Sequence, residues 1–174
     1  MNTTRAIAIS FLLALSGNAG AQAVGAGAPE TPADSPDSMF VQRAGPAAAA
    51  DVDISRLAVA NAQSADVRKF AEAMVQEHER NNRELATIAA HENIGLPKEI
   101  DDRHAQLRAQ LAVMHGSNFD HFYVETMRRD QERLAQLLRE SQATVSTPEL
   151  RTYIATTLPI VQDHLQTAQA IRFE

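Results

Sequence analysis

The sequence predicts an all-α protein, an antiparallel four-helix bundle with an extra short crossover helix. Apolar residues recur at steps of three and four along four long segments, which is the spacing that places them on one face of a helix. Ala, Leu, Gln, Glu and Arg, which favour helix, dominate these segments, and no stretch of useful length alternates apolar and polar residues as a half-buried strand does. Capping residues and Gly or Pro signals lie where the segments begin and end.

The first 23 residues predict a signal peptide that is removed on export. Arg5 precedes an apolar run from Ala6 to Leu15, and small residues then lead to Ala21-Gln22-Ala23, an A-x-A cleavage signal. Cleavage after Ala21 is a near alternative. The run is shorter than the ~20 apolar residues that a membrane span needs, and no later stretch is long enough. We therefore expect a periplasmic protein with no transmembrane span in the mature chain, and association with the outer membrane is left open.

The acidic balance of the chain bears on its partners. The formal net charge is −6, and loss of Arg5 with the signal peptide makes the mature chain more acidic. An acidic protein without a long basic run is not expected to bind nucleic acid or an anionic membrane surface. The chain has no cysteine, which excludes disulfides and thiolate metal sites. Neither a partner nor an oligomeric state follows from the pattern.

The folded domain is expected over residues 38–172. Residues 24–37, rich in Gly, Pro and Asp without periodicity, predict a flexible leader. The first helix is expected from about Met39 to Asn61. It should consist of two pieces, because Gly45-Pro46 interrupts it and Pro46 is suited to the first position of a new helix.

The second helix begins near Ser64, a favourable N-cap, and its stop is expected at Gly95 and Pro97. A short third helix is capped by Asp101 and ended by Gly116. Its apolar stripe comprises Leu107, Leu111 and Met114.

The fourth helix opens at Ser117-Asn118-Phe119-Asp120, which matches a capping pattern. The fifth opens at Thr147-Pro148-Glu149, and Pro159 inside it should produce a kink. The connections within the first and last helix pairs are only a few residues long, so both pairs should be antiparallel hairpins. The longer connection between the pairs carries the short helix and suggests a crossover.

Polar residues interrupt the apolar stripes of all four long helices. They are Asp51 on the first helix, His78 and Asn82 on the second, Gln131 on the fourth and His164 on the fifth. Counted from the hairpin ends, their positions differ by about one turn, or ~5 Å of helix rise. We therefore expect one buried polar layer near the middle of the bundle.

The first interpretation of this layer is structural. Buried polar groups are normally hydrogen-bonded to one another, and such a layer can fix the register of the helices. The two imidazoles would then be neutral and paired with Asp51, Asn82 or Gln131. No cofactor is expected under this interpretation.

The alternative interpretation is a transition-metal site, with copper as the first candidate. His78, His164, Met74 and Met127 would supply imidazole and thioether ligands, which together suit copper. Against this, methionine at helical spacing is more often a filler of the apolar core.

A di-iron oxidase site is not expected. Such a site needs Glu-x-x-His on two helices, whereas Val75 and Val161 stand at the Glu positions here. Nucleophilic catalysis has little support, since the few serines lie at caps and termini without nucleophile-elbow glycines. Asp130 is expected to be partly buried. The other histidines lie near helix ends or on polar faces and are expected to be solvated, namely His91, His104, His115 and His121.

Three segments in the right order resemble an exported bacterial family known as domain of unknown function 4142. They are MVQEHERNNREL at 74–85, FDHFYVETMRRDQ at 119–131 and LPIVQDHLQTAQAI at 158–171. The resemblance covers about 38–172 and implies a ferritin-like four-helix bundle. It implies no activity, because the family has no established one.

The resemblance also places individual residues. His78 matches a histidine of the family's second helix, with Asn82 for its asparagine, and His164 matches the Leu-Pro…His-Leu pattern. The fourth-helix pattern Met-x-x-Asp-His is met at Met127 and Asp130, but Gln131 stands where the family has histidine. If the family's histidines are ligands, this chain has lost one. We therefore expect a non-enzymatic binding or envelope-stress interaction module in the periplasm, with a copper-binding protein as the alternative.

Overall fold

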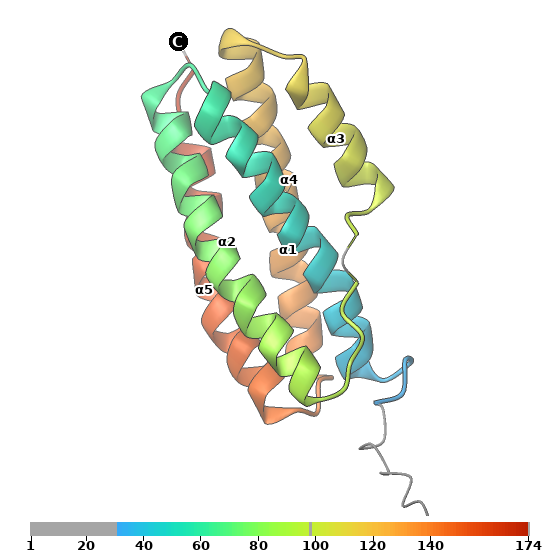
Figure 1. The fold of residues 1–174 in the computed structure, drawn as a ribbon. Helices are drawn as coiled ribbons and strands as arrows, with labels where there is room; N and C mark the ends of the chain where they lie inside the picture. The colour runs from blue at the N-terminus through green and yellow to red at the C-terminus, as the bar shows by residue number, and fades with distance from the viewer. Residues whose placement is uncertain (1–30, 98, 174) are drawn as a thin grey trace, which may run out of the picture.

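The computed structural model describes residues 31–97 and 99–173, so the expected signal peptide and most of the expected leader lie outside the described residues. All regular elements of the described part are helices (Figure 1). They are α1 Pro36–Asn61, α2 Ala65–His91, α3 Asp102–Ala112, α4 Gly116–Gln142 and α5 Pro148–Ala170. None of the described helices carries an apolar stretch that could cross a bilayer.

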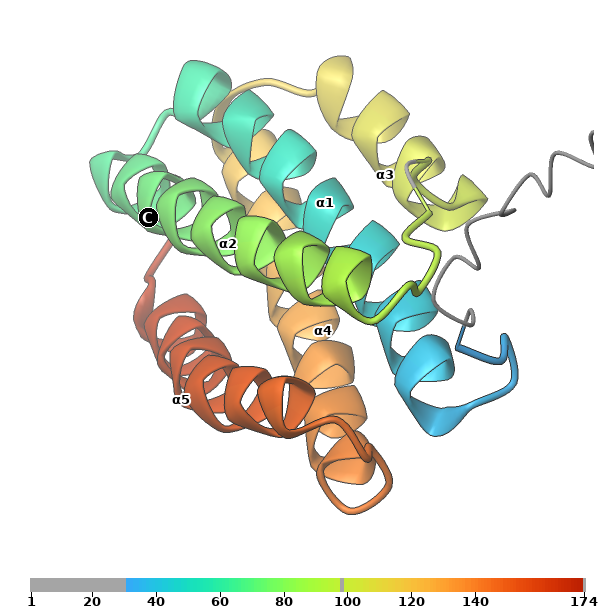
Figure 2. The ribbon, with the colours of Figure 1, turned by 60° about the horizontal axis from the view of Figure 1, so that its bottom comes forward.

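The four long helices form the expected bundle. α1 packs against α2 and α4, and α5 completes the ring by packing against α2 and α4 (Figures 1 and 2). Neighbouring helices run antiparallel, while α2 and α4 lie across the bundle from each other and run in the same direction. The long connection between them carries α3 up the outside of the bundle, where α3 contacts α1 and α4. The predicted fold class, including the short crossover helix, is confirmed.

α1 differs from its prediction, because it is one helix and not two pieces. It runs without interruption through Pro46, which the helix tolerates at the loss of one backbone hydrogen bond. Apolar side chains on both sides of the proline are buried, and this burial outweighs the local cost. Gly45 packs closely there, since a Cβ at this position would meet Leu96 Cδ1 and the leucine side chain would have to shift. α1 also begins at Pro36, capped by Ser35, two residues before the expected domain start.

At two other helix ends, the residues that form the cap differ from those predicted. α2 ends at His91, and Asn93, two residues further on, has φ 54°, so that Ile94 N–H donates back to Ala89 C=O. Asn93 therefore provides the left-handed residue that was expected at Gly95. At the start of α4, Asp120 does not cap its own helix. Its carboxylate instead accepts from the backbone N–H groups of Gln63 and Ser64, and so holds the α1–α2 turn.

The apolar core consists of two clusters, one at each end of the bundle. One contains Phe40 of α1, Leu85 of α2 and Ile154 of α5, among others. The other contains Ile54 of α1 and Phe119 of α4, again with further residues. On each long helix the residues of the predicted polar layer lie between the segments that supply these two clusters. The layer is therefore a mid-bundle boundary between two apolar regions.

Candidate functional site: a polar layer at mid-bundle

Gln131 lies at the centre of the polar layer and is fully buried, with 0% of its surface exposed. Its Nε2 donates to Asp51 Oδ2 at 2.9 Å, and its Oε1 lies 3.4 Å from His164 Nδ1. One glutamine thus connects α4 to α1 on one side and to α5 on the other. The structure brings Asp51, Gln131 and His164 together as the helix periodicity predicts.

The imidazole ring of His78 packs against this group. The imidazoles of His78 and His164 stack with their centroids 5.3 Å apart and their planes at 27°. Both side chains are buried, and Nε2 of each has no hydrogen-bond partner among the described residues. Burial, together with the neighbouring His164, lowers the pKa of His78 to about 3. Burial also lowers the pKa of His164, so both rings are neutral at neutral pH.

A carboxylate lies at the open edge of the histidine pair. Glu77 Oε2 is 3.3 Å from His164 Nε2, although the two atoms are not aligned for a hydrogen bond. When His164 donates through Nδ1 to Gln131, its Nε2 carries the lone pair. A lone pair and a carboxylate oxygen at this distance could be adjacent ligands of one cation, since bonds of ~2.0–2.2 Å separate neighbouring ligands by ~3 Å.

The two methionines proposed as thioether ligands are both fully buried. Met127 Sδ accepts a weak hydrogen bond from Ser55 Oγ at 3.7 Å, and the same hydroxyl accepts from Tyr123. Met127 is thereby engaged with α1 and the apolar cluster. Met74 belongs to that same cluster.

Asn82 is not a member of the buried layer as expected. It is half-buried, and the asparagine that α2 buries is its neighbour Asn81. The reason is the heptad spacing of the α2 stripe, in which Met74, His78, Asn81 and Leu85 follow at steps of four, three and four. Asn82 lies one position off this stripe.

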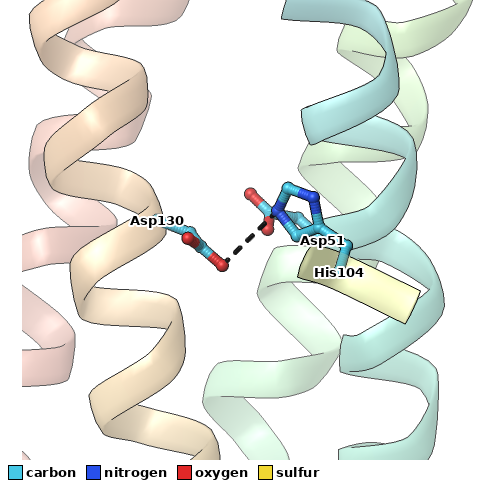
Figure 3. Close-up of side chains that lie close together, drawn as sticks. All are labelled: Asp51, His104 and Asp130. Atoms are coloured by element: carbon cyan, nitrogen blue, oxygen red, sulfur yellow. Dashed lines mark ion pairs between the residues drawn. The ribbon is translucent and has the colours of Figure 1, made fainter. Parts of the chain in front are cut away.

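The layer extends toward α3 through a residue that sequence reasoning placed in solvent. His104 is only 2% exposed, and its Nε2 lies 3.6 Å from Asp130 Oδ2 (Figure 3). Asp51, His104 and Asp130 each offer a ligand atom, and these atoms lie within 4.8 Å of one another. The missed signal is that His104 precedes Leu107 and Leu111 by three and seven residues, on the same face of α3. The other three histidines outside the layer, His91, His115 and His121, are exposed as predicted.

Comparisons with known proteins place the chain. A family model described as a domain of unknown function, DUF4142, matches residues 22–171. The chain belongs to the DUF4142 family. No curated protein matches this DUF4142 chain significantly.

Among solved structures, the chain is similar to the crystal structure of a DUF305 fragment from Deinococcus radiodurans. The TM-score is 0.70 at 15% identity, over 82% of this chain and 96% of that one. At this identity the similarity concerns the fold alone. It identifies this member of the DUF4142 family as a ferritin-like helical bundle, as predicted.

Proposed function

We propose that this chain is exported and acts in the periplasm as a non-enzymatic binding protein, with the polar layer as its ligand-binding part. Asp51 Oδ1, His78 Nε2 and His164 Nε2 are buried in the layer without a hydrogen-bond partner in the described part of the chain, and this observation carries the proposal. Leaving a buried polar atom unpaired costs about 1–3 kcal/mol. A ligand that bonds to these atoms would recover that cost.

Export is the first part of the proposal and is tested by processing. The full-length chain should be recovered from the periplasmic fraction with a new N-terminus at Val24, or at Gln22 if cleavage follows Ala21. N-terminal sequencing and intact mass give the result. As a control, arginine at both Ala21 and Ala23 should block cleavage, because the site needs small residues. An unprocessed wild-type chain in the cytoplasm would contradict the proposal.

The protonation of the histidine pair supports a binding role over acid–base catalysis. A general acid or base works best with a pKa near the working pH. The pKa of His78 is lowered to about 3, chiefly by burial, and the pKa of His164 is also lowered. Two imidazoles that stay neutral cannot exchange protons efficiently near neutrality. Neutral imidazole is, however, the form that binds metals.

Copper is the ligand that this pair favours, since imidazole suits copper and the buried thioether of Met74 lies in the neighbouring cluster. The supporting geometry is the stacked ring pair with both Nε2 atoms free, together with Glu77 Oε2 at 3.3 Å from His164 Nε2. We infer that one copper ion is held by His78 and His164.

Calorimetric titration of the metal-stripped protein with Cu(I), Cu(II) and Zn(II) tests this inference. We expect copper binding tighter than ~10 μM, and a loss of at least about 100-fold in affinity for His78→Ala and for His164→Ala. Met74→Leu should weaken Cu(I) selectively, because the thioether prefers the softer ion. His115→Ala, an exposed histidine, is the matched control and should change nothing. Binding weaker than ~10 μM, where the free energy is only about −7 kcal/mol, or binding unchanged in His78→Ala, contradicts copper binding here.

A further inference from the structure

Three potential ligands meet on the side of the polar layer that faces the crossover helix. Asp51 comes from α1, His104 from α3 and Asp130 from α4 (Figure 3). Each of the three is at most 5% exposed, and one ligand atom of each lies within 4.8 Å of the other two. These residues are far apart in the sequence, so only the folded chain assembles them.

Each carboxylate in this group has one oxygen engaged and one oxygen free. Asp51 Oδ2 accepts from Gln131 Nε2 at 2.9 Å, while Asp51 Oδ1 is buried with no partner among the described residues. Asp130 Oδ1 accepts from Arg103 at 2.8 Å and from Arg133 at 2.7 Å, while Asp130 Oδ2 is buried without a partner in the described structure. The engaged oxygens orient the carboxylates, and Asp130 Oδ2 lies 3.6 Å from His104 Nε2.

His104 is oriented by the residue that caps its own helix. Its Nδ1 lies 2.5 Å from Asp101 Oδ2, and its backbone N–H donates to Asp101 Oδ1 at 3.0 Å. Donation from Nδ1 to a carboxylate leaves the lone pair on Nε2, which is the atom directed at Asp130. A histidine held in this way by a carboxylate is the usual outer arrangement around a metal-bound imidazole.

Two cations already lie beside the group, since Arg103 and Arg133 both donate to Asp130 Oδ1. Arg103 contacts both Asp130 and His104 Nε2, but its side chain is 43% exposed and can turn outward. The group also borders a cavity of about 170 Å³ whose lining includes Asp51, Asp101, Arg103, His104 and Asp130. Burial, and repulsion from Asp130, raise the pKa of Asp51 well above its usual value, as expected where two carboxylates face each other. A small divalent cation would neutralise both acids, whereas among the described residues the two guanidinium groups bond only Asp130 of the pair.

We propose that Asp51, His104 and Asp130 form a binding site for one divalent transition-metal cation, separate from the histidine pair. One imidazole and two carboxylates are donors of intermediate hardness, which suit Zn(II) and Mn(II) better than Cu(I). At a tetrahedral ion, bonds of ~2.0–2.2 Å place ligand atoms ~3.3–3.6 Å apart, so a pair at the 4.8 Å limit must close by about 1.2–1.5 Å. The site needs α3, so the bound cation fastens the crossover helix to the bundle. It shares no ligand with the histidine pair and does not depend on copper binding there.

Calorimetric titration of the metal-stripped protein with ZnCl₂ and MnCl₂ at pH 7 tests the site. We expect one zinc ion per chain with a Kd below ~10 μM, and weaker manganese binding, as the order of divalent affinities requires. Asp51→Asn and His104→Gln should each weaken zinc by at least about 100-fold, more than the loss of an outer partner costs. Arg103→Met should tighten zinc, because it removes the cation that contacts both Asp130 and His104 Nε2. His78→Ala should leave zinc unchanged.

A second measurement guards against variants that merely unfold locally. In the wild type, zinc should slow hydrogen exchange of the α3 amides, and in Asp51→Asn it should not, while both proteins keep their helical circular dichroism. Three results would overturn the proposal: no zinc binding by the wild type, zinc affinity unchanged in Asp51→Asn, or weaker binding in Arg103→Met. The second result would assign the zinc to other histidines, and the His78→Ala titration would then distinguish the buried pair from exposed histidines. The third would make Arg103 a permanent partner of the acids.

Discussion

Replacing Gln131 by alanine is expected to lower the free energy of unfolding by about 3–5 kcal/mol. The side chain is completely buried and connects Asp51 on α1 with His164 on α5. Its removal leaves both partners buried without this hydrogen bond, at about 1–3 kcal/mol each, and opens a cavity between two apolar clusters. Urea unfolding followed by circular dichroism measures the change.

The matched control is Gln136→Ala, five residues further along α4 and on its outer face. Gln136 is exposed and donates to Glu140, an exposed neighbour on the same helix, so its removal should cost less than about 0.5 kcal/mol. Equal costs for the two variants would show that the layer contributes nothing to stability. A large cost confined to Gln131 would show that the glutamine found where the family resemblance expects histidine is the structural centre of the layer.

The polar layer could be predicted because helix periodicity is a local property. Asp51, His78, Gln131 and His164 each interrupt an apolar stripe, and hairpins with short turns fix the relative heights of their helices. The prediction missed by one position at Asn82, because steps of three and four are equally compatible with one face over a single turn. The longer pattern from Met74 to Leu85 selects Asn81.

The α3 side of the layer could not be predicted in the same way. A short helix has no hairpin that sets its height, so nothing local indicates that His104 meets Asp51 and Asp130. Only docking of α3 on α1 and α4 brings them together. Similarly, Gly45-Pro46 is a break signal in isolation, yet tertiary burial on both sides keeps α1 continuous. Local sequence signals predict where a helix begins and ends only where tertiary packing does not favour a different boundary.

Acid should destabilise the metal-free protein through His78. The pKa of His78 is lowered to about 3 by burial and by His164, against ~6.5 in the unfolded chain. Below about pH 6.5, His78 therefore binds a proton in the unfolded state and not in the folded state. Its contribution to the free energy of unfolding is full above that pH and is lost as the pH falls toward 3. Between pH 7.5 and pH 5 the loss is about 2 kcal/mol.

Other groups around the layer titrate as well. The effect of His78 is therefore measured as the difference in free energy of unfolding between the wild type and a His78 variant. His164 contributes with the same sign, because its pKa is also lowered by burial, although Glu77 and Asp163 oppose the shift. Asp51 acts in the opposite direction. Its raised pKa makes its contribution full below about pH 4 and lost as the pH rises through its folded value.

The cost of His78→Leu should therefore shrink by about 2 kcal/mol between pH 7.5 and pH 5, since leucine removes the His78 proton from the balance. Urea unfolding in EDTA at several pH values measures this difference. His115→Gln, at an exposed histidine, should give a difference that does not change with pH. If the cost of His78→Leu is also independent of pH, the pKa of His78 must be the same in the folded and unfolded chains. The polar layer would then be open to water.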